Sequence, residues 1–199
     1  MFSKVFKASG AFFGFIKRYG RMKFILILLC CFSGLLSAQQ TPLTWKEFVL
    51  GSPAMSLDLP GIVAPQDAAL PQNIAAYIKK YEAYYLKDDA KGMVITLMHI
   101  TYAGEIIADL VGAANGTLTQ WENTGAKVDV QTFTKQVFAD RNSVIQKGLF
   151  FIDGKQSIFT NLVIGEGASM WQIVMIVPAN DDAMKKAMER MYASIQFKY

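Results

Sequence analysis

The stretch SIFTNLVIGEGASMWQIVMIVPANDDAMKKAMERM, residues 157–191, decides the fold. It contains two long apolar runs on either side of the glycine turn Gly165–Gly167, a pattern that predicts two strands joined by a hairpin. Asn180–Asp182 then supply N-cap side chains for a helix. The helical spacing is carried by Met184, Met188 and Met191, which we expect to pack in the core. A hairpin followed by a helix lying against it is the predicted C-terminal unit.

Upstream of this unit the same strand pattern recurs. Residues 127–139 and 142–154 form two more β-type runs, and the second ends in Asp153-Gly154, a hairpin signal. Farther back, residues 74–89 and 93–103 predict another hairpin, whose second arm is apolar on both faces, as in a covered strand. Residues 54–61 predict an early strand that ends at a Pro-Gly turn, and residues 61–73 a loop.

Residues 104–125 change to a helical period. Ile106, Leu110, Leu118 and Trp121 recur at three- to four-residue spacing, with Ala113 or Ala114 between them. Glu105 and Asp109 are expected in the first turns, and Gly125 at the C-terminal stop. The element order therefore predicts an α+β fold, with helices packed on an antiparallel β-sheet.

Two stretches carry a family resemblance. The opening WKEFVLGSPAMSLDLPG (Trp45–Gly61) and the closing run from Phe151 to Phe197 are similar to the first and last segments of PsbP-like domains. The resemblance implies an α/β/α sandwich built on an antiparallel sheet, in a family whose members mostly bind partner proteins or have no assigned function. These motifs are markers of the fold and carry no catalytic signature, so no binding residue is transferred from the family.

The N-terminal segment MKFILILLCCFSGLLSAQQ, residues 22–40, resembles a secretory signal peptide. A basic flank precedes an apolar run of about a dozen residues, shorter than the roughly 20 that a membrane span needs. Cleavage is expected near Ala38, which would leave the protein periplasmic or secreted. A buried helix, an uncleaved anchor, or a lipoprotein acylated at Cys30 or Cys31 are the alternatives. Residues 1–21 fit either a long basic n-region or a misassigned extension, with Met22 as the true start.

The predicted organisation is thus a signal peptide, residues 1–38, followed by a single α+β domain, residues 39–199. Six of the 20 Lys and Arg precede Gln39, so the mature part carries 14 basic and 16 acidic residues. This balance disfavours nucleic acid as a partner, because such proteins present a basic face. Both cysteines lie in the leader, and a single histidine remains, too few ligands for a zinc site. No metal or other cofactor is expected.

No catalytic motif accompanies the polar residues. His99 lies inside an apolar strand pattern and is read as a hydrogen-bonded sheet residue. The pairs Asp88-Asp89 and Asp181-Asp182 are explained by a hairpin turn and a helix start. Gly165–Ser169 is interpreted as a hairpin, not a phosphate loop, and the Asn115–Thr117 sequon falls within the predicted helix. An envelope hydrolase would need converging carboxylates, for which the candidates are Asp140, Asp153 and Glu166.

Aromatic residues are the remaining candidates for a site. Tyr and Trp are favoured at interfaces because each combines apolar area with a polar group, although they also fill ordinary cores. The possible interaction surface comprises Tyr77, Tyr81, Tyr84, Tyr85 and Trp121, while Trp171 belongs to the same aromatic set. The leading hypothesis is an exported, non-enzymatic domain that binds an unidentified protein or envelope component. The alternative is a small-molecule or lipid carrier with a groove between helix and sheet.

Overall fold

The computed structural model describes residues 42–67 and 75–198. The predicted signal peptide, with Cys30, Cys31 and Ala38, lies outside these ranges, so its cleavage or acylation stays a prediction. Leu43–Tyr199 forms one compact unit. Within the described part of the chain, no helix has the length and apolar character required to cross a membrane.

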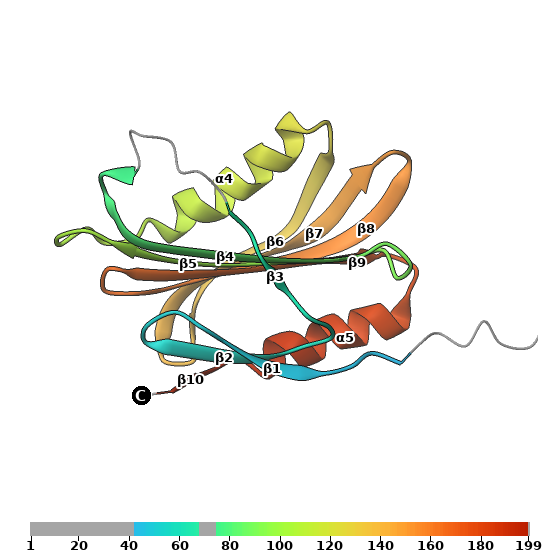
Figure 1. Ribbon diagram of the computed structural model, residues 1–199. Coiled ribbons are helices and arrows are strands. Elements are labelled where there is room, and N and C mark those ends of the chain that lie inside the picture. Colours follow the sequence, from blue (N-terminus) through green and yellow to red (C-terminus); the bar gives the residue numbers. More distant parts are fainter. Residues whose placement is uncertain (1–41, 68–74, 199) are drawn as a thin grey trace, which may run out of the picture. The chain divides into compact units, whose positions relative to one another are not determined.

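A large sheet of seven strands forms the middle of this unit (Figure 1). Every neighbouring pair in it is antiparallel. The order across the sheet is β3 (Ala64–Pro65), β4 (Ile78–Asp88), β5 (Met93–Tyr102), β9 (Ser169–Pro178), β8 (Lys155–Glu166), β7 (Arg141–Ile152) and β6 (Lys127–Phe138). The predicted hairpins and the meander are confirmed, and β5 is a central strand, as its two apolar faces indicated.

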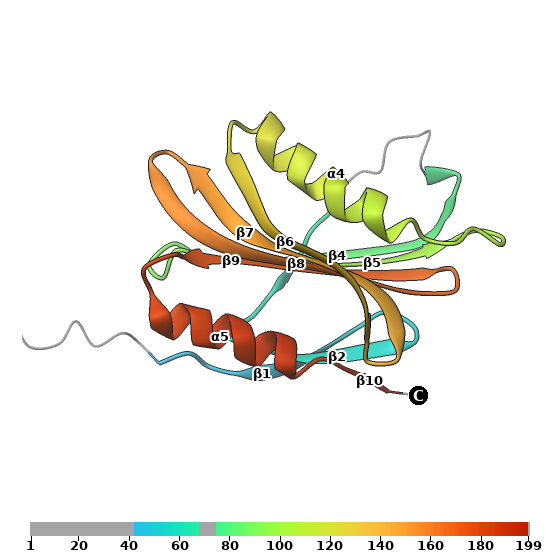
Figure 2. The ribbon, with the colours of Figure 1, turned by 180° about the vertical axis from the view of Figure 1, so that it is seen from behind.

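Different elements cover the two faces of the large sheet (Figures 1 and 2). Helix α4 (Leu110–Asn123) lies alone on one face. Helix α5 (Asp182–Ala193) shares the other face with a small antiparallel sheet, in which β2 (Ala54–Leu59) pairs with β1 (Lys46–Leu50) and β10 (Gln196–Lys198). The α+β prediction is confirmed, and one outer layer of the sandwich is part helix and part sheet.

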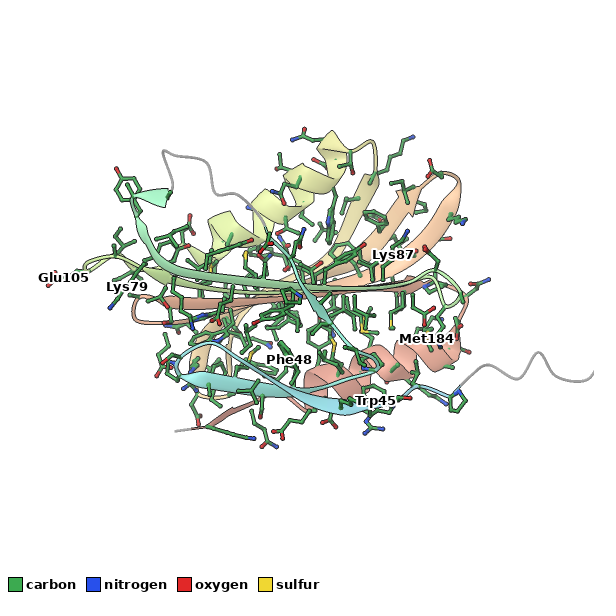
Figure 3. All side chains as sticks on the ribbon, in the orientation of Figure 1. Trp45, Phe48, Lys79, Lys87, Glu105 and Met184 are labelled. Atoms are coloured by element: carbon green, nitrogen blue, oxygen red, sulfur yellow. The ribbon has the colours of Figure 1, made fainter. Side chains whose placement is uncertain are left out.

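The main core lies between the large sheet and the layer that contains α5. Alternate residues of β9, from Trp171 to Val177, point into it and meet Met184, Met188 and Met191 of α5. Figure 3 shows Phe48 and Met184 in this layer, one from the small sheet and one from α5. Helix α5 begins where predicted, because the Asp181 side chain accepts hydrogen bonds from the amides of Ala183 and Met184.

Helix α4 starts later than its sequence pattern indicated. Asp109 is its N-cap and accepts a hydrogen bond from the amide of Gly112, so Glu105 and Ile106 precede the helix. A β-carbon on Gly112 would lie 2.3 Å from the Asp109 carboxylate, and this glycine therefore permits the cap. The predicted end is correct, since Gly125 follows the C-cap residue Thr124 with a φ of 89°.

Candidate functional site

A groove runs between α4 and the part of the large sheet that this helix leaves uncovered. It has a volume of about 1680 Å³. Residues of the β7–β8 hairpin line one end of it. Most of its floor is made by side chains of two neighbouring strands that point toward the α4 face. These are Val94, Thr96, Met98 and Ile100 of β5, with Met170, Gln172, Val174 and Ile176 of β9. Tyr102 of β5 also lines the groove, and from Val94 to Tyr102 the floor is about 27 Å long, at ~3.4 Å per residue.

Aromatic side chains form the two walls. Tyr81 and Tyr85 of β4 line one side of the groove, and Trp121 of α4 lines the other. Trp121 is held in place by edge-on contacts with Phe150 and Phe159, at centroid distances of 5.4 and 5.2 Å. Burial raises the pKa of the Tyr81 hydroxyl, so this hydroxyl is uncharged at neutral pH.

One end of the groove is polar and carries both charge signs. Lys87 pairs with Asp89 at 2.7 Å in the β4–β5 turn, and Lys91 pairs with Asp88 at 2.8 Å. The hydrogen bond to Asp89 raises the pKa of Lys87, and that from Lys91 lowers the pKa of Asp88. Lys87 stands on the α4 side of the sheet (Figure 3). The acidic and basic side chains of this turn neutralise one another, so this end of the groove should not select strongly for ligands of either charge.

A buried network of amide side chains joins α4 to the sheet beside the groove. Gln146 of β7, Asn161 of β8 and Gln172 of β9 are hydrogen-bonded in sequence, at 3.0 and 2.9 Å. Gln146 also donates to Asn115 of α4 at 2.9 Å, and Gln172 donates to Thr117 of α4 at 2.7 Å. In the described part of the chain, no side-chain nitrogen or oxygen that is closed off from solvent lacks a partner. The network therefore fixes the position of α4, and with it the width of the groove.

The predicted aromatic surface is divided between two faces of the sheet. Tyr81, Tyr85 and Trp121 line the groove together. Tyr84 points to the opposite face, where its ring packs edge-on against Phe48 at 4.9 Å. Tyr77 is 58% exposed and is not among the groove residues. The five residues do not form one surface, and their role in an interaction stays a prediction.

His99 occupies the core, as its apolar context indicated. It is 0% exposed, its ring lies 5.1 Å from that of Trp171, and Nδ1 is 3.0 Å from the Glu82 carboxylate. Burial lowers the pKa of His99, although Glu82 opposes this effect. Burial would raise the pKa of Glu82, but hydrogen bonds from Lys80 and His99 outweigh it and the pKa is lowered. His99 is a packing residue of the α5 side, remote from the groove.

The three carboxylates named for a hydrolase do not converge. Asp140 precedes β7 and Asp153 follows it, so the two stand at opposite ends of a strand about 40 Å long. Glu166 accepts a 2.7 Å hydrogen bond from Arg141, near the Asp140 end. Among the described residues, no group of three or more His, Cys, Asp or Glu is placed to hold a metal ion.

Sequence reasoning missed the residues that build the groove floor and the amide network. Gln146, Asn161 and Gln172 come from three separate strands, and no motif links them. A signal did exist for Gln172, which is a large polar residue in a strand whose other residues are almost all apolar.

The comparisons with known proteins concern the fold. No family model matches the sequence, and no curated protein matches it. Among solved structures, the chain is similar to cyanobacterial PsbP (CyanoP) from Synechocystis sp. PCC 6803, with a TM-score of 0.52 and 6% identity. That match covers 83% of this chain and 99% of the other. LpqN, involved in cell envelope biogenesis of Mycobacterium tuberculosis, matches with a TM-score of 0.44 and 12% identity, over 81% and 88% of the two chains. The chain has a PsbP-like fold.

Proposed function

We propose that this protein is an exported, non-enzymatic domain that binds the acyl chain of an envelope lipid, or a similarly long apolar molecule, in the groove beside α4. The groove itself carries the proposal. Its floor is apolar over most of its length, and its volume exceeds the ~300–1,000 Å³ typical of pockets for compact ligands. A long chain lying along β5 and β9 would fill such a space.

The chemistry of the groove supports binding more than catalysis. Three charged side chains of the β4–β5 turn at its rim, Lys87, Asp88 and Asp89, are engaged in ion pairs with near neighbours. His99, whose pKa is lowered, lies on the other face of the sheet. Export rests on the leader sequence, with its basic flank, short apolar run and small-residue exit.

Gly116 offers a way to test the groove without damaging the fold. This glycine of α4 lines the groove, and a β-carbon added there would meet no atom within 4 Å. Gly116→Phe is therefore expected to fill the groove while the core stays intact. Thr119→Phe is the matched control, since Thr119 is an exposed residue of the same helix that does not line the groove.

The experiment is a calorimetric titration of oleic acid into the full-length protein and the two variants. The wild type and Thr119→Phe should bind oleic acid alike, and Gly116→Phe should bind at least about tenfold more weakly, a change of ~1.4 kcal/mol. The thermal midpoints of all three proteins are compared to verify folding. Absence of saturable binding by the wild type, or equal binding by Gly116→Phe, would refute the proposal.

A second candidate function is protein binding at the edge strand β6. This strand is 12 residues long and is hydrogen-bonded on one side only, to β7. Val130, Phe133 and Val137 are exposed on it, and their partners in β7 place all three on one face. A partner protein could add a strand there. Phe133→Lys should then release a partner co-purified from the host envelope, whereas Gly116→Phe should not.

A further inference from the structure

In the amide network, the donor and acceptor atoms of each side chain can be assigned. This assignment determines which polar atom is left to interact with a ligand in the groove. Asn161 donates through Nδ2 to the backbone carbonyl oxygen of Ala114 at 3.3 Å and to Oε1 of Gln146 at 3.0 Å. A backbone carbonyl can only accept, so the amide nitrogen of Asn161 must face α4. Its oxygen, Oδ1, must therefore face Gln172.

The same reasoning assigns the amide of Gln172. Nε2 of Gln172 donates both to Oδ1 of Asn161 at 2.9 Å and to Oγ1 of Thr117 at 2.7 Å. Thr117 in turn donates to the carbonyl oxygen of Ala113 at 3.3 Å, so its oxygen is an acceptor for Gln172. Both N–H groups of Gln172 are engaged, and only its oxygen, Oε1, is left.

Oε1 of Gln172 is an acceptor that the described residues do not satisfy. The side chain is only 5% exposed, yet no hydrogen bond to Oε1 is formed within the described part of the chain. No fully buried side-chain oxygen there lacks a partner, so Oε1 must be accessible, and Gln172 lines the groove. Its neighbours on the floor are Met170 and Val174 of the same strand and Met98 of β5.

We propose that the groove prefers an acyl ligand that carries a hydroxyl group partway along its chain, and that this hydroxyl donates a hydrogen bond to Oε1 of Gln172. This inference rests on the proposed acyl-binding function. An unsubstituted chain would cover Oε1, exclude solvent from it and leave a buried acceptor without a donor, which is costly. A hydroxylated chain would supply its own O–H to Oε1, and its apolar parts would contact Met170 and Val174 on either side.

Oleic acid and ricinoleic acid provide a matched pair of probes, because they differ by one mid-chain hydroxyl. The full-length protein is titrated with each in a calorimeter. We expect ricinoleic acid to bind at least about fivefold more tightly, as one satisfied hydrogen bond implies. Equal binding, or tighter binding of oleic acid, would overturn the inference and leave the proposed function intact. Binding of neither acid would instead refute the proposed function.

Two variants assign the preference to Gln172. Gln172→Met removes Oε1 at similar length and should make the two acids bind equally. Thr96→Val removes the other polar group on the floor, a hydroxyl on β5, and should keep the preference for ricinoleic acid. Loss of the preference in Thr96→Val would assign the contact to Thr96 and overturn the role of Gln172. If Gln172→Met does not fold, the wild type still shows whether ricinoleic acid is preferred, and Thr96→Val still shows whether Thr96 is responsible.

Discussion

Replacing Asn161 by Asp should destabilise the protein strongly at neutral pH and much less in acid. The two side chains have nearly the same shape, and Asn161 is 0% exposed, so packing is unchanged. The substitution puts an oxygen where Nδ2 now donates to Gln146 at 3.0 Å and to Ala114 at 3.3 Å. An ionised carboxylate would face two acceptors without water, and the group must therefore take up a proton on folding.

The magnitude follows from the protonation. With a pKa of ~3.9 in the unfolded chain, keeping the carboxyl neutral at pH 7 costs about 4 kcal/mol, at ~1.36 kcal/mol per unit. Loss of one N–H donor adds about 1 kcal/mol, which gives a deficit of about 5 kcal/mol. At pH 4 the protonation cost nearly vanishes, and about 1–2 kcal/mol should remain. The pKa in the folded variant is raised, so the deficit relative to the wild type must shrink as pH falls.

Urea unfolding of both proteins between pH 4 and pH 8, followed by tryptophan fluorescence, measures this difference. Asn142→Asp is the matched control, because Asn142 is exposed at the start of β7, and it should stay within about 0.5 kcal/mol of the wild type. A deficit below about 1 kcal/mol at pH 7 would mean that the amide network is not formed as described. A deficit independent of pH would refute the protonation argument.

Three further predictions concern the other side of the sheet. Gly51→Ala should lower the urea midpoint markedly, because φ is 83° and the new β-carbon would lie 2.7 Å from the His99 ring. Gly154→Ala is the control: its φ is 73°, but no atom lies within 4 Å of the new β-carbon, so the free energy of unfolding should fall by only about 1–2 kcal/mol. The pKa of His99 is lowered in the folded state, so stability should fall as pH drops below the unfolded value of ~6.5, and His99→Phe should flatten the stability profile between pH 7 and pH 5. Met191→Ala should cost about 2–5 kcal/mol in urea unfolding, whereas Met191→Leu should stay within about 1.5 kcal/mol.

Local signals in the sequence were sufficient for most of the elements. The Asp153-Gly154 turn, the Asp181 cap and the stop at Gly125 each act within a few residues of where they are read, and each is found as predicted. The predicted start of α4 was too early, because the apolar spacing and the capping residue give conflicting local signals. Ile106 continues the apolar spacing toward the N-terminus, but the Asp109 side chain caps the helix first.

The non-local pairings could not be predicted in the same way. β10 pairs with β2 from the opposite end of the domain, and β5 lies beside β9, with α4 and three other strands between them in the chain. Periodicity indicates that a strand is covered on both faces but does not say by what. The groove depends on these pairings, since most of its floor is the β5–β9 pair and its aromatic walls come from β4 and α4.

Gln172 nevertheless shows what a sequence can say about a site before the fold is known. A large amide inside a strand such as SMWQIVMIVP must be buried, and a buried amide needs partners for two N–H groups and one oxygen. This requirement predicts other polar residues beside it in space, and Asn161 and Thr117 meet it for the nitrogen. No described residue donates a hydrogen bond to the oxygen, and Gln172 is one of the residues that line the groove. A polar residue in an otherwise apolar strand therefore predicts a network of hydrogen-bonded side chains around it. Where one polar atom of that network has no partner in the protein, the same reasoning points to a ligand that supplies one.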